Sequence, residues 1–326
     1  MKTSQHILIS RTDAIGDVVL TLPMCGYLKK VYPDCRISFL GRSYTEAVIN
    51  TSQAVDEFVN YDELKNLPIK QQADKLKALK IDTIVHVYPR KEIANLAKFA
   101  GIKTRIGTTN RAFHWLSCNK LVKLSRKNSN LHEAQLNIRL LEPLDIKEMP
   151  AISELPIYYH FKSRAALPEQ FKALMDDNRL NIILHPKSNG SGKEWDLKKF
   201  AELIDLLPKE RYRVFISGSE KERLLLKDWI TVLPDHVIDL TGKFELDQFI
   251  AFIAQADGLV AASTGPLHLA ALAGIHALGL YPTKKPGNPG RWGPIGKLAE
   301  HIDSGTENLD SISAKDVCAR INDWKK

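Results

Sequence analysis

The sequence of 326 residues has few cysteines and no long apolar run, and both features restrict the class of protein. Its four cysteines form no CxxC pair and no His-containing group with the spacing of metal ligands, so disulfides and structural zinc are not expected. No segment approaches the roughly 20 apolar residues of a spanning helix. Arg11 and Asp13 interrupt the first apolar run too early for a secretory signal, so we expect a cytoplasmic protein.

Three familiar nucleotide and metal signatures are missing as well. The segment RTDAIGDVV at 11–19 has one glycine where an NAD-linked oxidoreductase would show GxGxxG. The segment LHPKSNGSGKEW at 184–195 is not a Walker A loop, because no hydroxyl residue follows its Lys193. No DxD sequence occurs, so the sequence predicts neither a metal-bridged diphosphate nor a bound cofactor.

The charge balance is mildly positive, with 46 Lys and Arg against 38 Asp and Glu and a formal net charge of +8. This surplus suits a partner that carries phosphates or carboxylates, although it also occurs in proteins without such a partner. Because no basic tail is present, nucleic acid is not expected. The basic loops at 103–111 and 120–127 either attract an anionic lipid and bring the protein to a membrane surface, or form a solvated face.

Short β-branched runs alternate with helical patterns along nearly the whole chain, which predicts an α/β fold of parallel sheets covered by helices. We expect a Rossmann-like domain over 1–150, a proline-containing linker over 151–180, and a second Rossmann-like domain over 181–326 that ends in a helix. Segment 16–32 is expected to form one helix, and the run starting at His276 the last strand. Two such domains facing each other across a cleft are the simplest architecture.

The segment AASTGPLHLAALAG at 261–274 is the sharpest candidate site. A strand is expected to end at Ser263, Thr264 and Gly265, and Pro266 to open a helix. Unpaired N–H groups at a helix start bind phosphate, and His268 lies about one turn further on. The alternative is an ordinary capped helix packed on the sheet.

Two more candidates follow expected strands of the second domain. Lys187 and Lys193 lie on the Gly/Ser loop 184–195 and could contact phosphate, or they belong to a flexible surface loop. Glu222 or Glu220 could accept hydrogen bonds from ribose hydroxyls, or both are solvated carboxylates of a first helical turn.

Asp17 is the candidate catalytic group of the first domain. It follows the first expected strand, next to Gly16, and an ionised carboxylate there could take a proton from an alcohol as general base. Asp13 is a second carboxylate within reach. The alternative for Asp17 is a plain N-cap of the next helix.

Five segments occur in this order along the chain: GDVVLTLP, HEAQLNIRLL, HPKSNGSGKEW, STGPLHLAALAG and GLYPTKKPGNPGRWGPIG. Together they resemble glycosyltransferase family 9, the ADP-heptose:lipopolysaccharide heptosyltransferases. The resemblance implies a GT-B fold and an inverting transfer of heptose from ADP-heptose to a hydroxyl of the lipopolysaccharide inner core. Another nucleotide sugar or acceptor glycan, or a nucleotide-binding protein without transferase activity, remains the alternative.

The resemblance also implies roles for individual residues. Asp17 matches the proposed catalytic base, Lys193 a lysine that steadies the donor phosphates, and Glu222 lies near a ribose-binding glutamate. Thr264, Gly265 and His268 match the diphosphate-binding turn. Many members have Asp where this chain has Ser263, and the basic residues Lys284, Lys285 and Arg291 depart from the commonest family form. Both departures leave the donor sugar and acceptor open.

Overall fold

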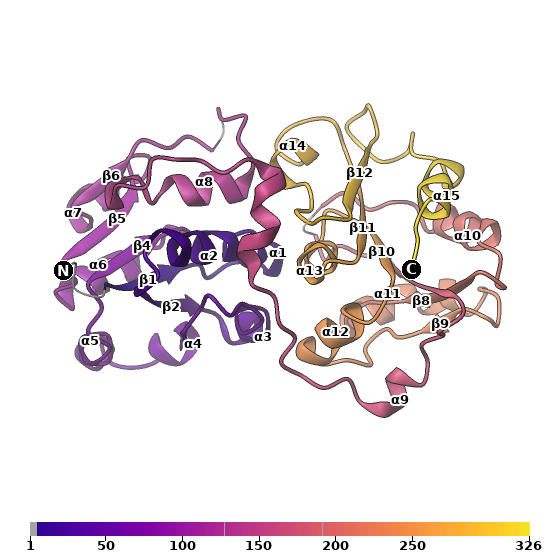
Figure 1. Ribbon diagram of the computed structural model, residues 1–326, viewed down its shortest axis with the longest axis horizontal. Helices are drawn as coiled ribbons and strands as arrows, with labels where there is room; N and C mark the ends of the chain where they lie inside the picture. The colour runs from indigo at the N-terminus through magenta and orange to yellow at the C-terminus, as the bar shows by residue number, and fades with distance from the viewer. Residues whose placement is uncertain (1–4, 127, 191) are drawn as a thin grey trace. The chain divides into compact units, whose positions relative to one another are not determined.

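The chain folds into two compact units in the computed structural model, which describes residues 5–126, 128–190 and 192–326 (Figure 1). Unit 1 comprises Met1–Lys162 and unit 2 comprises Ser163–Lys326. The boundary falls within the segment 151–180. Each unit is described by itself below.

Unit 1 is built on a six-stranded parallel sheet with the order β3-β2-β1-β4-β5-β6. The strands are β1 (His6–Ser10), β2 (Arg36–Gly41), β3 (Glu57–Asn60), β4 (Thr83–His86), β5 (Thr104–Thr108) and β6 (Lys120–Val122). The α-helices are α1 (Ile15–Val19), α2 (Leu22–Val31), α3 (Glu46–Ile49), α4 (Tyr61–Leu64), α5 (Ile69–Ala78), α6 (Lys91–Phe99), α7 (Ala112–Ser117) and α8 (Glu133–Arg139). Three 3-10 helices complete the unit: η1 (Ser43–Thr45), η2 (Glu142–Leu144) and η3 (Ile152–Tyr159).

Unit 2 repeats this plan with a second six-stranded parallel sheet, of order β12-β11-β10-β7-β8-β9. Its strands are β7 (Leu180–His185), β8 (Tyr212–Ile216), β9 (Ile238–Asp239), β10 (Gly258–Ala262), β11 (His276–Tyr281) and β12 (Ala299–Asp303). Its helices are α9 (Glu169–Lys172), α10 (Leu197–Leu206), α11 (Glu220–Ile230), α12 (Leu246–Ile253), α13 (Gly265–Ala273), α14 (Pro289–Trp292) and α15 (Ala314–Asn322).

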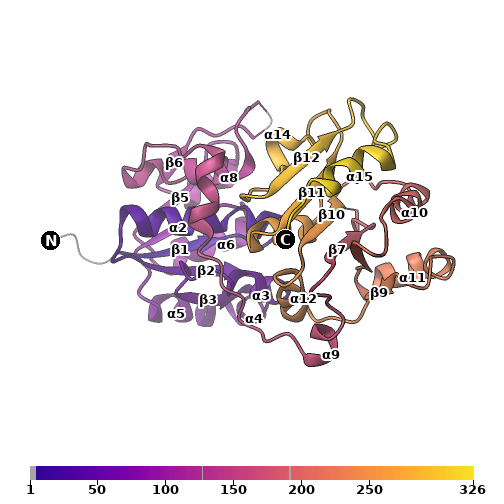
Figure 2. The same ribbon diagram turned by 45° about the vertical axis from the view of Figure 1, so that its right-hand side comes forward.

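The central strands are buried along their whole length and mostly apolar, because helices cover both faces of each sheet (Figure 2). Every residue of β1 and of β10 is buried. In unit 1, Leu8 of β1 and Ile84 of β4 share one core cluster with Leu96 of α6. These observations confirm the expected α/β class with two Rossmann-like units.

Two local expectations are wrong. Segment 16–32 forms two helices, because the chain turns at Leu20 and Thr21 and Pro23 then lies in the first turn of α2. β11 is not the last strand, since β12 follows it and pairs with it. Within the segment 151–180, η3 packs against α2 in unit 1, and the Ser52 hydroxyl donates to the Tyr159 carbonyl at 2.8 Å.

The strand order decides which loops are neighbours. β1 lies in the middle of its sheet, so the chain that follows it emerges beside the ends of β2 and β4. In unit 2, β7 lies between β10 and β8, so the loops after these three strands share one edge of the sheet. Carboxyl edges of open parallel sheets are where such folds bind ligands.

Candidate active site

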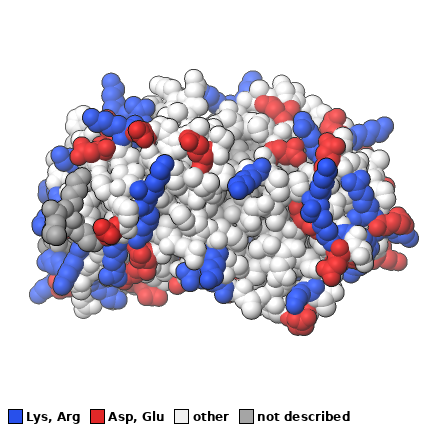
Figure 3. All heavy atoms as spheres, in the orientation of Figure 1, with Lys and Arg blue, Asp and Glu red and all other residues white. Residues whose placement is uncertain are grey.

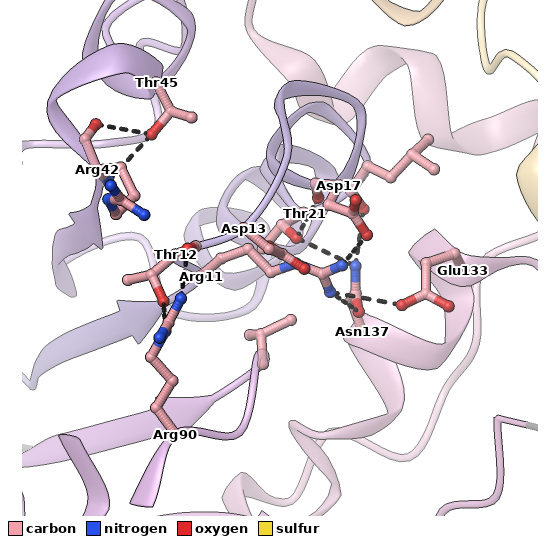
Figure 4. A network of polar contacts seen from close by, with 12 residues as sticks. Arg11, Thr12, Asp13, Asp17, Thr21, Arg42, Thr45, Arg90, Glu133 and Asn137 are labelled. Atoms are coloured by element: carbon pink, nitrogen blue, oxygen red, sulfur yellow. Dashed lines mark hydrogen bonds and ion pairs between the residues drawn. The ribbon is translucent and has the colours of Figure 1, made fainter. Parts of the chain in front are cut away.

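A buried arginine organises the polar site of unit 1. Arg11 directly follows β1, its side chain is 3% exposed, and its guanidinium holds both candidate carboxylates (Figure 4). Nε donates to Asp13 Oδ1 at 2.7 Å, and Nη2 donates to Asp17 Oδ1. Both aspartates keep about a fifth of their side-chain surface exposed. The carboxylates are therefore fixed in place and still reach solvent.

A residue from far along the chain completes this cluster. Glu133, at the start of α8, lies with Oε1 3.4 Å from Arg11 Nη1 and 2.8 Å from Arg126 Nε, and it is fully buried. Asn137 lies one turn further along α8, and its Oδ1 accepts from Arg126 Nη2 at 2.9 Å. The Asn137 amide also donates to the Thr21 hydroxyl at 3.1 Å, which ties α8 to the turn after α1.

The charges of the cluster explain its protonation behaviour. Two guanidinium groups face three carboxylates, so one net negative charge remains when all five groups are ionised. Burial raises the pKa of Asp13 to about 6, although pairing with Arg11 opposes the shift. Burial also raises the pKa of Asp17, and the Glu133 charge adds to the effect while Arg11 opposes it. For Arg11, burial lowers the pKa, but the three carboxylates outweigh burial and raise it.

The structure excludes a capping role for Asp17. The N-cap of α1 is Ala14, and Asp17 is the third residue of the helix, with its carboxylate on Arg11. Gly16 lies inside the same helix, so no special backbone conformation is needed there. A carboxylate with a raised pKa, held by a fixed cation and open to solvent, is suited to accept a proton from a hydroxyl.

In unit 2 the turn after β10 forms the expected helix start. Thr264 is the N-cap of α13 in an extended conformation, and Gly265 and Pro266 begin the helix. The Thr264 side chain makes no capping bond, and its Oγ1 is buried without a hydrogen-bond partner in the part of the chain that the structure describes. His268 is buried in the first turn. A buried hydroxyl beside the first N–H groups of a helix is a donor available to an anion.

The loop between β7 and α10 lies directly against this turn. A Cβ built on Gly192 would approach the Ser263 carbonyl oxygen to 3.0 Å, so a side chain there would press on the turn. Lys193 follows Gly192 and is exposed. The rest of the loop is held by Glu194, which accepts from the Ser188 N–H at 3.0 Å and pairs with Lys187 Nζ at 2.8 Å. The structure thus places Gly192, the residue before Lys193, beside the turn and leaves Lys187 in an ion pair that stabilises the loop, so the phosphate contact of Lys193 stays a prediction.

Glu222 lies at the same sheet edge, after β8. It is buried and forms a capping box, because its Oε2 accepts from the Ser219 N–H at 2.7 Å and from the Ser219 hydroxyl at 2.9 Å. It is therefore not the solvated carboxylate that the alternative interpretation described. Glu220, in contrast, is largely exposed and pairs with Arg223 at 3.6 Å.

Sequence reasoning missed Arg11, Glu133 and Arg126. Glu133 and Asn137 are four residues apart and so share one face of the helix expected there, but only the structure shows that this face, like all of residues 133–138, is buried. A buried charge requires a partner of opposite sign, and in the structure Arg11 after β1 and Arg126 supply it. Among the described residues, no group of three His, Cys, Asp or Glu side chains could hold a metal ion. No helix in the described part of the chain is long and apolar enough to cross a membrane.

The sequence profile of glycosyltransferase family 9, the heptosyltransferases, matches residues 71–321. The chain belongs to glycosyltransferase family 9. A family 9 glycosyltransferase of Veillonella parvula superimposes with a TM-score of 0.84 at 20% identity, over 99% of this chain and 97% of that one. The Escherichia coli heptosyltransferase WaaC, solved with ADP, superimposes with a TM-score of 0.75 at 18% identity, over 98% and 99% of the two chains.

Sequence relatives support the same family. The lipopolysaccharide core heptosyltransferase OpsX of Haemophilus influenzae is 24% identical, over 95% of this chain and 88% of OpsX. Lipopolysaccharide heptosyltransferase 3 of Escherichia coli is 25% identical, over 82% of this chain and 80% of that protein. The chain is thus a family 9 glycosyltransferase with the two Rossmann-like units of the solved members.

Proposed function

We propose that the chain transfers heptose from ADP-heptose to a hydroxyl of the lipopolysaccharide inner core, with inversion at the anomeric carbon. The observation that carries the proposal is the Arg11 cluster, which presents Asp13 and Asp17 as fixed, partly exposed carboxylates with raised pKa values. Attack by a sugar hydroxyl requires such a base, because an unassisted hydroxyl is a weak nucleophile.

On the acceptor side, Asp17 takes the proton of the attacking hydroxyl. Arg11 keeps the Asp17 carboxylate oriented, and the net negative charge of the cluster makes it a better proton acceptor than an isolated pair. The hydroxyl oxygen bonds to the anomeric carbon as the bond from that carbon to the diphosphate breaks. Asp13 is the alternative base, since its contact with Arg11 is equivalent.

On the donor side, the ADP leaving group is held by the start of α13. The first N–H groups of the helix, the Thr264 hydroxyl and His268 bind the diphosphate, and Lys193 neutralises the charge that develops on it. Glu222 accepts from the ribose hydroxyls at the neighbouring strand end. Ser263 replaces a charge common in the family and leaves these donors intact, so ADP remains the proposed nucleotide. The acceptor is a glycolipid, so we place the enzyme in the cytoplasm with peripheral contact at the inner membrane.

Purified protein incubated with ADP-heptose and a panel of inner-core acceptors, followed by mass spectrometry, tests this proposal. We expect one acceptor to gain a single heptose and ADP to be released in equal amount. Other ADP-sugars and UDP-N-acetylglucosamine serve as matched donors. Transfer from one of them in place of ADP-heptose would overturn the sugar assignment, and no transfer from any donor would overturn the activity.

A further inference from the structure

Two adjacent hydroxyl side chains, Ser263 and Thr264, follow β10 at the carboxyl edge of the unit 2 sheet. Charge does not mark a ligand surface on the face of unit 2 that Figure 3 shows, because Lys and Arg occur there together with Asp and Glu. Hydrogen-bond direction is a more specific guide, since a hydroxyl group has only one proton to donate. The two side chains differ in how their protons are used.

Tyr281, the last residue of β11, lies beside Ser263. The strands β10 and β11 are parallel, and Ala262 at the end of β10 pairs with Leu280, so the next residue of each strand is a neighbour of the other. Tyr281 is fully buried, and a Cβ built on Gly279 would clash with its ring, so the ring lies over that glycine and is fixed in place. α13 packs against both strands (Figure 1).

The Tyr281 hydroxyl has its proton committed to the protein. It donates to the Trp292 carbonyl oxygen at 2.6 Å. A carbonyl oxygen only accepts, and a phenol has one proton, so the Tyr281 oxygen can act only as an acceptor toward Ser263. This fixes the direction of the hydrogen bond between the two side chains.

The Ser263 hydroxyl is the donor in this bond. Burial raises the pKa of Tyr281, and the hydrogen bond from the Ser263 side chain opposes the shift, because a donor to the phenol oxygen stabilises its ionised form. Donation therefore runs from Ser263 to Tyr281 and from Tyr281 to the Trp292 carbonyl. Ser263 is only half-buried, so a ligand at the sheet edge meets its oxygen as a hydrogen-bond acceptor.

Thr264 differs from Ser263 in this respect. Its Oγ1 is buried and has no hydrogen-bond partner among the residues that the structure describes, so its proton is available to a phosphate oxygen. Phosphate oxygens only accept, and they gain nothing from an oriented acceptor such as Ser263. A sugar hydroxyl can donate to it. In a nucleotide diphosphate sugar the sugar is joined to the second phosphate, so its hydroxyls come within reach of a residue next to the phosphate-binding turn.

We propose that Tyr281 orients the Ser263 hydroxyl to accept a hydrogen bond from a hydroxyl group of the donor sugar. Ser263 then contacts the sugar and not the diphosphate, whereas Thr264 contacts the diphosphate. Tyr281 is a positioning residue, because it is buried behind Ser263 and acts on the sugar only through it. The inference rests on the proposed function, in which the donor is an ADP-sugar held at the start of α13.

Calorimetry with ADP and with ADP-heptose, in the absence of acceptor, tests the proposal on the full chain. Ser263→Ala should raise the Kd for ADP-heptose about two- to tenfold, the contribution of one neutral hydrogen bond, and should leave the Kd for ADP within about twofold of wild type. Tyr281→Phe keeps the ring but releases the Ser263 hydroxyl from its fixed direction. It should raise the Kd for ADP-heptose at least about twofold and leave the Kd for ADP unchanged.

Tyr212→Phe is the matched control for the loss of a buried tyrosine hydroxyl. Tyr212 is also buried in the unit 2 sheet, and its hydroxyl donates to Asn322 Oδ1 at 2.8 Å, but it begins β8 and so lies at the opposite edge of the sheet. Tyr212→Phe should lower the melting temperature about as much as Tyr281→Phe does. It should leave the Kd values for ADP and ADP-heptose at those of wild type.

The two ligands separate a contact with the sugar from other roles. A Ser263→Ala variant that loses affinity for ADP and ADP-heptose by the same factor would place Ser263 on the diphosphate and overturn the proposal. Unchanged affinity of this variant for both ligands would overturn it as well. A Tyr281→Phe variant that binds ADP-heptose like wild type, or that weakens both ligands equally, would show that Tyr281 only supports the fold.

Transfer assays distinguish a failure of this inference from a failure of the proposed function. Wild-type protein that shows the expected differences in ADP-heptose affinity but transfers heptose to no acceptor would contradict the proposed function alone. Wild-type protein that transfers heptose while Ser263→Ala keeps the wild-type Kd for ADP-heptose would contradict the role of Ser263 and Tyr281 alone. Absence of binding to both ADP and ADP-heptose would overturn both.

Discussion

Replacing Glu133 with glutamine changes the charge of the Arg11 cluster while keeping its shape. The carboxylate lies 2.8 Å from Arg126 Nε and 3.4 Å from Arg11 Nη1 and is fully buried. Deleting one partner of a buried ion pair costs about 3–5 kcal/mol, as expected for Glu133→Ala. The isosteric glutamine still accepts a hydrogen bond, so we expect a loss of about 1–3 kcal/mol and a melting temperature lower by roughly 3–9 °C.

The kinetic consequence has a defined sign. The Glu133 charge is one of the influences that raise the pKa of Asp17, so the neutral side chain should lower that pKa. The acidic limb of the kcat/KM profile, measured by ADP release, should then move to lower pH. Activity should remain measurable, because Arg11 still holds Asp17.

A surface ion pair provides the control for this prediction. Glu307 pairs with Lys284, and both side chains are about two-thirds exposed. Glu307→Gln should change neither the melting temperature nor the pH profile. A Glu133→Gln enzyme with lower activity at every pH and an unmoved acidic limb would refute the electrostatic coupling and leave Glu133 a structural role only.

Three further predictions concern single side chains. Lys193→Ala should raise the Kd for ADP, measured by calorimetry, at least about tenfold, because a charged donor to phosphate is lost. The control Lys198→Ala should leave this Kd unchanged. Equal Kd values for Lys193→Ala and wild type would remove Lys193 from the donor site. Thr264→Val should leave the unliganded protein as stable as wild type in urea melts, or about 1 kcal/mol more stable, because a buried unpaired hydroxyl disappears. The same substitution should weaken ADP binding. A destabilised unliganded protein would contradict this account. Burial raises the pKa of Asp13 from 3.8 to about 6, so the folded state binds the proton of the Asp13 carboxyl more tightly than the unfolded state does. The stability that this proton provides is therefore lost as the pH rises from about 4 to 6. Asp13→Asn should flatten that decline by about 1–3 kcal/mol in urea melts, and an unchanged pH dependence would show that Asp13 is not perturbed.

The sequence predicted those parts of the fold that depend on local pattern. Alternating β-branched and helical segments gave the α/β class, and the run before Ser263 ends as a strand where expected. β12 was missed because AEHID is only half-buried at the edge of its sheet and lacks an apolar pattern. The break between α1 and α2 was missed because apolar residues continue through it, and periodicity alone does not register a one-turn interruption.

The Arg11 cluster shows what a single sequence cannot provide. Arg11 and Glu133 are 122 residues apart, and only the packing of α8 beside α2 brings them together. Asp17 was selected from its place after β1 together with the family resemblance, whereas the charges of Glu133 and Arg126 that act on its pKa depend on the long-range contact. Turns that follow strands, such as Ser263 to Gly265, are predicted more easily because the parallel sheet itself positions them.

The central claim is that Asp17 removes the proton of the attacking hydroxyl, and Asp17→Asn tests it most directly. Asparagine keeps the size of the side chain and can still accept from Arg11, so folding and ADP affinity should match wild type. Single-turnover transfer of heptose should fall by about 10²–10⁴. Turnover within a few-fold of wild type, with ADP still bound, would contradict the account, and the same loss in Asp13→Asn alone would move the base to Asp13.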